Sequence, residues 1–469
     1  MKRRDFLRGG SLALGGLALT PIISKGQVLP LAPSSKRAKN IIFMVSDGMS
    51  SGTLAMADLY SRRKFGRPSH WISLYEQSQV QRGLMDMASL NSIVTDSAAA
   101  SSSWGGGQRV NNGSLNISPS GEEYLPILQK FKKSGKKVGC VTTVPITHAT
   151  PAGFSVATKS RNSQEQIASL YSTLGFDVLL GGGSKYFDAS FRDDKTDMYQ
   201  KFRTKGYSVV KSKEELLKAS VHYPLLGIFE TDGLPYSIDH NSSSLLSTNV
   251  PTLAEMSVKA IEQMQSHPQG FVLQIEAGKV DWAAHGNDIG GLLYDQLAFD
   301  EAVGKVLDFA MKDGNTLVVI TSDHGNANPG IIYGKEADKN FDRVHHFTHS
   351  NEWILQGITP STTKNQIIER VAEANAAIRI TDEEAAQLLS YYKEASMENG
   401  VYNARHLPFK LLAEIQKQYI SVGWISMDHS ADYTEIAMYG PGSENLKPFI
   451  RNTDIHEMLL VAAHVENKF

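Results

Sequence analysis

The sequence of 469 residues contains a single cysteine, Cys140. One cysteine excludes a disulfide within the chain and excludes zinc sites built from several cysteines. Charge of one sign is also scarce, because 47 Lys and Arg nearly balance 49 Asp and Glu, for a formal net charge of -2. With no basic excess, we expect no nucleic-acid binding specificity. The hydrophobic content of 41% is ordinary for a globular protein, and the length allows a large core or two domains.

The sequence lacks an apolar run long enough to cross a membrane, and it lacks repeats and low-complexity tracts. Its N-terminus carries paired arginines, Arg3 and Arg4, followed by a Gly-rich and mildly apolar stretch at residues 10–23. This pattern resembles a bacterial twin-arginine signal, R-R-x-F-L. We therefore expect residues 1–30 to be a signal peptide and the protein to be periplasmic or secreted. The alternative is a basic disordered leader.

A glycine-rich phosphate loop is also missing. The segment L-L-G-G-G at residues 179–183 follows a predicted strand, but it has no Lys-Ser/Thr and does not match G-x-G-x-x-G. We interpret it as a structural turn. The sequence therefore indicates neither a P-loop nor a dinucleotide-binding glycine motif at this position.

What the sequence does contain is a repeated pattern of buried strands that end in polar residues. Apolar runs at residues 40–45, 271–275 and 316–320 are typical of parallel strands covered on both faces. Open α/β sheets bind ligands at the carboxyl ends of such strands. The polar residues there are Asp47, Glu276, Asp323 and His324, with His148 and Thr150 after a further strand at 138–144. This alternation of strands and helices predicts an α/β fold with a mostly parallel central sheet and helices on both faces.

The segment at residues 276–288, E-A-G-K-V-D-W-A-A-H-G-N-D, is the most informative stretch. Asp281 and His285 are four apart, which places both side chains on one face of a helical turn. A carboxylate and an imidazole on adjacent turns supply two of the three protein ligands of an open zinc site. The alternative is an N-capping Asp followed by a surface His.

Three other polar residues suit an anion and a hard cation. Ser97 follows Thr95-Asp96 in the first turn of a predicted helix, where a helix dipole favours an anion, although it could also be a capping residue. Arg161 offers a planar fork for phosphate, and its alternative is a solvated surface charge. Pro151 holds Thr150 extended, so that its hydroxyl could bind a hard cation.

Residues 328–422 differ in character, with few apolar runs and with helices expected near 363–375, 381–395 and 407–418. We interpret this region as an insertion that decorates the sheet edge, over the site or at a subunit contact. It contains His345, His346 and His349, a loop cluster that is more often incidental than metal-binding. After it, residues 434–439 are expected to be the last strand, and a terminal helix is expected from residue 452.

Together the candidates supply nitrogen and oxygen ligands for two zinc ions, hard oxygens for a third ion, and a serine with an arginine for phosphoryl transfer. The ordered motifs that contain them resemble those of bacterial alkaline phosphatases. They are D-G-M (47–49), T-D-S-A-A (95–99), H-A-T-P-A (148–152), S-R (160–161), the segment 276–288, S-D-H (322–324) and H-S (429–430).

The resemblance implies a fold, a set of metals and an assembly. Residues 36–469 would form an alkaline phosphatase catalytic domain, active as a homodimer, with two zinc ions and one magnesium-type ion per chain. One zinc would be held by Asp281, His285 and His429, and the other by Asp47, Asp323 and His324. Thr150 and Glu276 would complete the third site, toward which Asp47 would bridge.

The resemblance also implies catalytic roles and two departures. Ser97 would be the nucleophile and Arg161 the phosphate clamp. His148 and Trp282 stand where the best-known enteric members have Asp and Lys, while other members have His and Trp. His148 could therefore ligate the third ion and favour zinc or cobalt over magnesium. Trp282 would contact substrate and would remove a cation from the phosphate site.

The implied activity is the hydrolysis of phosphate monoesters through a phosphoserine intermediate, with little selectivity for the alcohol. One alternative is a phosphodiesterase or sulfatase of the same superfamily, against which the third metal site argues. Another is a non-catalytic periplasmic metal-binding protein, in which Ser97 and Arg161 would have no purpose.

Overall fold

The computed structural model describes residues 36–467, except for residues 79, 394–396, 399–400 and 404–405. The expected signal peptide at 1–30 lies outside the described residues, and its assignment stays a prediction. Within the described part, no helix combines the length and the apolar character that a membrane span needs.

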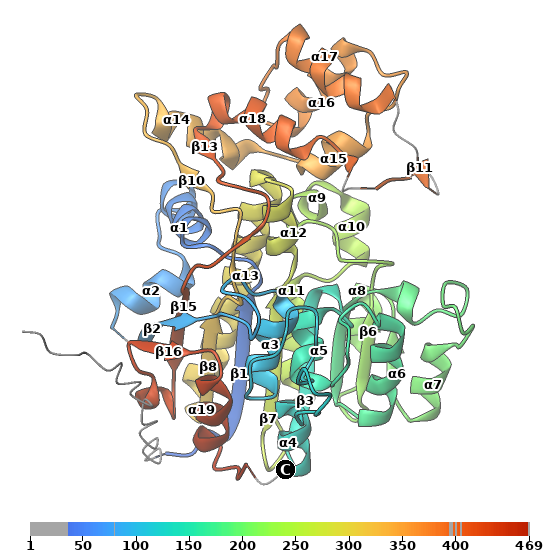
Figure 1. The fold of residues 1–469 in the computed structure, drawn as a ribbon, viewed down its shortest axis with the longest axis vertical. Coiled ribbons are helices and arrows are strands. Elements are labelled where there is room, and N and C mark those ends of the chain that lie inside the picture. Colours follow the sequence, from blue (N-terminus) through green and yellow to red (C-terminus); the bar gives the residue numbers. More distant parts are fainter. Residues whose placement is uncertain (1–35, 79, 394–396, 399–400, 404–405, 468–469) are drawn as a thin grey trace, which may run out of the picture. The chain divides into compact units, whose positions relative to one another are not determined.

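A sheet of ten strands forms the centre of the described chain (Figure 1). All neighbouring strands are parallel except for β15, which is antiparallel to both β2 and β8. The predicted fold class, α/β with a mostly parallel central sheet, is therefore confirmed. In spatial order the strands are β16 (Phe449–Arg451), β2 (Gln81–Asp86), β15 (Thr434–Tyr439), β8 (Thr316–Thr321), β1 (Asn40–Ser46), β7 (Phe271–Ala277), β3 (Lys137–Pro145), β4 (Val178–Gly182), β6 (Leu225–Ile228) and β5 (Ser208–Val210).

Helices cover both faces, which explains why β1, β7 and β8 are buried at every position. One layer packs α3, α4, α5 and α19 together, and the other centres on the long helix α13 with α1, α2, α11 and α12 around it. The bounds are α1 (Ser51–Phe65), α2 (His70–Glu76), α3 (Ser97–Gly105), α4 (Ile127–Lys133), α5 (Ala149–Ser155), α11 (Leu253–Met264), α12 (Lys279–His285), α13 (Ile289–Asp313) and α19 (Asp454–Ala462). Near β6 in Figure 1 lie α6 (Gln164–Leu174), α7 (Met198–Thr204) and α8 (Lys213–Lys218), while α9 (Ser237–Ser242) contacts α13, and α10 (Ser244–Asn249) contacts α8 and α9.

The region predicted to be an insertion forms helices that gather at the top of Figure 1. They are α14 (Ala337–Asp342), α15 (Asn351–Gln356), α16 (Lys364–Ala374), α17 (Asp382–Ser390) and α18 (Phe409–Ile420). Ile354, Val371, Leu388 and Leu412 are among the residues of a separate apolar cluster there. Strands β10 (Gly330–Ile331) and β13 (Val422–Gly423) pair where this region leaves and rejoins the rest of the chain, and β11 (Met397–Glu398) pairs with β12 (Val401–Tyr402) inside it.

The expectation that residues 434–439 are the last strand is wrong, because β16 follows and pairs with β2 at the sheet edge. β16 has three residues, and Phe449 is half exposed. Such a short edge strand has no apolar run, so the sequence pattern gives no signal for it.

Candidate active site

Three neighbouring strands carry acidic residues to one edge of the sheet. β1 lies between β7 and β8, and Val45 pairs in register with both Glu276 and Thr321. Asp47 follows β1, Glu276 is the penultimate residue of β7, and Asp323 follows β8. Because the strands are parallel, these carboxylates meet at the carboxyl edge, where α/β sheets bind ligands.

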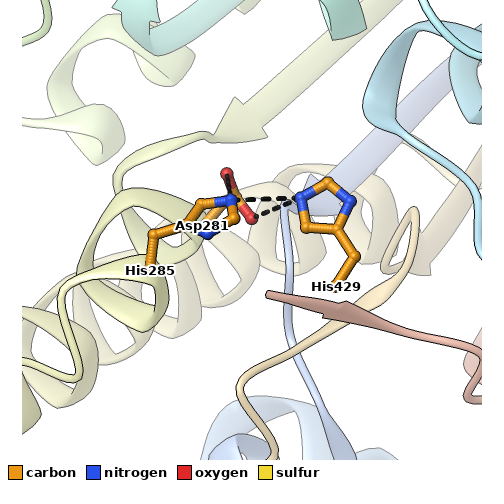
Figure 2. Close-up of side chains that lie close together, drawn as sticks. All are labelled: Asp281, His285 and His429. Carbon is orange, nitrogen blue, oxygen red and sulfur yellow. Dashed lines mark hydrogen bonds and ion pairs between the residues drawn. The ribbon is translucent and has the colours of Figure 1, made fainter. Parts of the chain in front are cut away.

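The first group of metal-ligating side chains is Asp281, His285 and His429 (Figure 2). Asp281 and His285 lie one turn apart on α12, as their spacing predicted. His429 comes from β14 (His429–Ser430), which pairs with β9 (Gly325–Asn326). The Nε2 atoms of His285 and His429 are each 3.5 Å from an oxygen of Asp281 and 3.1 Å from one another.

The second group is Asp47, Asp323 and His324, all fully buried. His324 Nε2 lies 3.5 Å from Asp47 Oδ1 and 3.3 Å from Asp323 Oδ2. The backbone N–H of Gly48 donates to Asp323 Oδ1 (3.0 Å), and its φ of +69° brings this turn against Asp281. A Cβ at Gly48 would lie 2.5 Å from Asp281 Oδ1, so only glycine fits between the two groups.

The third group is Asp47, His148 and Glu276, so Asp47 is shared between two groups. His148 precedes α5, and its Nδ1 is 3.9 Å from Glu276 Oε1. Thr150 Oγ1 donates to Asp47 Oδ2 at 3.5 Å, while Thr142 Oγ1 donates to Glu276 Oε2 at 2.5 Å. The residues predicted for a third ion are thus brought together.

The three histidines of the first two groups are held in one tautomer. Each Nδ1–H donates to a backbone carbonyl: His285 to Met427 (2.7 Å), His429 to Thr95 (3.0 Å) and His324 to Gly325 (3.3 Å). The Nε2 atom of each ring is therefore directed at its group. This arrangement is typical of metal-ligating histidines.

The buried carboxylates of the second and third groups are also suited to bind cations. Four atoms among them are buried without a hydrogen-bond partner in the described residues: Asp47 Oδ1, Asp323 Oδ2, Glu276 Oε1 and His148 Nδ1. Burial, and then the neighbouring carboxylates, raise the pKa of Asp47 far above its usual range. Burial raises the pKa of Asp323 to about 7. Cations would neutralise these carboxylates and supply the missing partners.

The first group carries opposite charges. Although burial opposes ionisation, His285 and His429 hold the pKa of Asp281 well below its usual range. Burial lowers the pKa of His429, but Asp281 outweighs it and raises that pKa to about 9. The donor set of nitrogen and carboxylate oxygen, three protein ligands in each of two groups, is the one found in open zinc sites.

The anion-binding side of the site is built around the N-terminus of α3. Ser97 is its first residue, and Ser97 Oγ lies 3.2 Å from His324 Nε2. Asp96 caps the helix by accepting from the N–H of Ala99 (2.9 Å), and its other oxygen accepts from Arg161 Nη1 (3.1 Å). Asp96 directly precedes Ser97 in the sequence. Its bond therefore holds the guanidinium of Arg161 next to the N-terminus of α3, where the helix dipole is positive.

Comparison with known proteins identifies the family. A family model described as alkaline phosphatase matches residues 38–465. The chain belongs to the alkaline phosphatase family. It is 30% identical over 428 residues to alkaline phosphatase 4 of Bacillus subtilis (strain 168), covering 89% of this chain and 87% of that protein. It is also 30% identical over 433 residues to alkaline phosphatase 3 of the same organism, with the same shares covered.

The fold is shared with a solved member of the family. The crystal structure of Thermus thermophilus alkaline phosphatase has a TM-score of 0.86 and 31% identity, and the match covers 96% of each chain. The protein is therefore a metal-binding phosphoric monoester hydrolase of the alkaline phosphatase family. The alternative of a non-catalytic metal-binding protein is not supported.

Some residues of this alkaline phosphatase site were not found from the sequence. Asn326 donates to Asp281 Oδ1 (2.7 Å) and so orients a ligand from β9. Thr142, which orients Glu276, lies inside a strand and gives no motif. Trp282 was predicted from the sequence, but its contact with His148 was not: the two rings stand edge-on, with the centroids 6.3 Å apart. Such contacts depend on the tertiary arrangement and leave no local pattern.

The histidines of the inserted region belong to none of the three metal-ligating groups found among the described residues. His345 packs against Tyr60 with the ring centroids 4.5 Å apart. His349 instead stacks on Trp353 at 3.9 Å.

Proposed function

We propose that this alkaline phosphatase cleaves phosphate monoesters through a phosphoserine formed on Ser97. The observation that carries the proposal is the position of Ser97 Oγ, at the positive end of α3 and 3.2 Å from a ligand atom of the second metal group. The second metal group contacts this hydroxyl through His324, and the guanidinium of Arg161 is bonded to the neighbouring Asp96.

The fit of the side chains supports zinc in the groups of Asp281 and Asp47 and a harder ion in the group of Glu276. When bound, these cations lower the pKa of a hydroxyl or water and stabilise negative charge on the leaving oxygen. Glu276 and Thr150 favour magnesium in the third site. His148 would add a nitrogen donor and favour zinc or cobalt there only where its Nε2 no longer accepts from Arg161, because a neutral imidazole has a single free lone pair.

The chain's own groups account for the remaining steps. Ser97 Oγ attacks phosphorus in line with the leaving oxygen, and the P–O bond to that oxygen breaks as the new one forms. The serine proton passes to solvent water, and the leaving alkoxide takes a proton from water to depart as the alcohol. Arg161 donates two parallel hydrogen bonds to equatorial oxygens of the phosphoryl group. Water then cleaves the phosphoserine from the vacated side, releasing inorganic phosphate and restoring Ser97.

A sister activity toward diesters or sulfate esters is less well supported. The complete third group, with Thr150 beside it, would hold a further cation, whose positive charge would suit the dianion of a phosphate monoester. Comparing hydrolysis of a monoester, a diester and a sulfate ester would separate these activities, and a preference for either of the last two would contradict the proposal.

Export from the cytoplasm is part of the same proposal. The paired arginines Arg3 and Arg4 support export by a twin-arginine route, which places the enzyme in the periplasm or outside the cell. Such a route transports folded protein, so the metals would be bound before export. Fractionation of cells into periplasm and cytoplasm checks this placement.

The decisive experiment follows the configuration at phosphorus with a chiral phosphate ester. Two successive in-line displacements retain configuration overall, and an alcohol such as Tris can replace water in the second. Ser97→Ala removes both signatures but leaves slow hydrolysis with inversion, because Arg161 and the metal groups remain. Ser103→Ala is the matched control, since its hydroxyl bonds only Ala99 O within the same helix (2.9 Å). Inversion by the unmodified enzyme would reduce Ser97 to a capping residue.

A further inference from the structure

Lys279 is a buried cation beside the site that no step of the proposed mechanism uses. It is the first residue of α12, only 5% exposed, and its backbone N–H donates to Thr143 Oγ1 at the end of β3 (3.1 Å). Within the described part of the chain, its ammonium meets aromatic rings in place of a hydrogen bond or ion pair. It lies 3.7 Å from the ring centre of Tyr236 and 4.8 Å from that of Trp282.

A buried ammonium without an ion pair is costly, so the fold must gain something from it. Its charge acts at longer range on Asp239 and Asp295. Burial raises the pKa of both carboxyls, that of Asp295 to about 7, and Lys279 opposes the rise. These carboxylates balance the ammonium without binding it, which leaves the ammonium at the face of the two rings.

The indole of Trp282 is confined on several sides. Trp282 lies one turn after Lys279 on α12, and its ring stands edge-on to His148 at an interplanar angle of 77°. Gly233 packs against the side chains of Trp282 and Lys279. A Cβ at Gly233 would lie 2.8 Å from Trp282 Cζ3 and 3.3 Å from Lys279 Cδ. The orientation of the indole therefore depends on the lysine and the glycine together.

His148 connects the indole to the anion clamp. Its Nε2 lies 3.0 Å from Arg161 Nη2, and its Nδ1 faces Glu276. A continuous set of contacts thus runs from Lys279 through Trp282 and His148 to the guanidinium.

We infer that Lys279 is a positioning residue for phosphate binding. By a cation–π contact it holds the Trp282 ring against His148, and His148 then holds Arg161 in the orientation that receives phosphate. This inference rests on the proposed role of Arg161 as the phosphate clamp. The ammonium of Lys279 lies 4.8 Å from the ring centre of Trp282, so a cation remains close to this position although its side chain is uncharged.

The test compares Lys279→Met, Lys279→Arg and Trp282→Leu, with inorganic phosphate as the probe. Lys279→Met keeps the length of the side chain and removes its charge. A cation–π contact corresponds to about a twofold to thirtyfold change in an equilibrium, with desolvated pairs toward the upper end. We therefore expect the inhibition constant of phosphate and the KM to rise by about that factor, with kcat changed by less than about twofold. Zinc content should stay the same, and Lys279→Arg should recover most of the affinity.

The double variant identifies the route of the effect. In a Trp282→Leu background, which has no aromatic ring at this position, Lys279→Met should weaken phosphate binding by less than about twofold, because the ring that the ammonium positions is gone. The same loss in both backgrounds would overturn the inference, since Lys279 would then act by its electric field alone. An unchanged inhibition constant in Lys279→Met would also overturn it.

Gly233→Ala is an independent probe, because it moves the indole by contact and changes no charge. The backbone of Gly233 lies outside the left-handed region, so alanine adds crowding without backbone strain. We expect weaker phosphate inhibition with unchanged zinc content, and no effect would contradict the inference even if Lys279→Met failed to fold. Trp282 fluorescence, taken as the difference from Trp282→Leu, should change in Lys279→Met and Gly233→Ala. That signal does not depend on turnover, so it separates failure of this inference from failure of the proposed function.

Discussion

Arg161 shows how one side chain of the site is held ready. Asp96 accepts from one of its terminal nitrogens at 3.1 Å, and His148 lies 3.0 Å from the other. The side chain is part-buried and comes from a loop, so these two contacts define its direction. The same guanidinium can therefore meet an anion with little loss of conformational entropy.

Arg161→Ala should weaken inhibition by inorganic phosphate by roughly tenfold to a hundredfold, the range for hydrogen bonds to a charged group. The inhibition constant of phosphate for Arg161→Lys should lie between those of the wild type and Arg161→Ala, because the point charge of lysine cannot form the planar fork. Metal content should not change. The measurement is competitive inhibition by phosphate together with zinc analysis, and Lys159→Ala, an exposed cation nearby, is the control. Loss of zinc with unchanged phosphate affinity would make Arg161 structural.

At the scale of elements, α3 is supported at both ends. Asp96 caps the end that carries Ser97, and His456 of α19 supports the other. His456 Nδ1 donates to Trp104 O (2.9 Å), and its Nε2 accepts from the ammonium of Lys130 (3.0 Å). Burial, followed by repulsion from Lys130, lowers the pKa of His456 to about 4.

This contact predicts a loss of stability in acid. The pKa of His456 is 6.5 when unperturbed and about 4 when folded, so the folded state favours the neutral ring. Its contribution is full above pH 6.5, and it is lost as the pH falls toward 4. The loss is at most about 3 kcal/mol from this one group.

The check measures the free energy of unfolding against pH for the wild type and for His456→Gln, whose amide can keep both hydrogen bonds but does not titrate. The wild type should lose more stability than the variant between pH 6.5 and 4. Parallel curves would show that His456 does not contribute to the acid response.

For the whole molecule, the metals should link activity to stability. The buried carboxylates of the three groups lose their neutralising charge when cations leave, while the rest of the fold is unchanged. Exhaustive chelation should abolish hydrolysis and lower the melting temperature by several degrees. Zinc together with magnesium or cobalt should restore both. Full activity after verified removal of metal would refute the ligand assignments.

Assembly is a second property of the whole molecule. The family resemblance predicts a homodimer, the commonest closed symmetry among soluble oligomers. Sedimentation of the active enzyme should therefore give twice the mass of the chain at the concentrations used in assays. A single monomeric species with full activity would contradict this prediction.

The sequence by itself determined the fold class and the chemical types at the strand ends. Buried strands have continuous apolar runs, and a helix repeats every 3.6 residues, so the spacing of Asp281 and His285 alone places them on one face. The ordered motifs also indicated the family, which the comparisons confirm. The ends of α17 and α18 differ by a few residues from the expected 381–395 and 407–418, because local patterns set helix ends only loosely.

Only the tertiary structure decided which side chains meet. His429 joins Asp281 because β14 pairs with β9, and Asp47 serves two groups because β1 lies between β7 and β8. β16 was missed, because a three-residue edge strand carries no periodic signal. The contacts of the Lys279 ammonium with the rings of Tyr236 and Trp282 could not be predicted either, because they depend on how the side chains pack in the folded protein. The sequence shows which apolar residues recur at the spacing of a helix or a strand. The distances between segments far apart in the sequence are set by how strands and helices pack across the sheet.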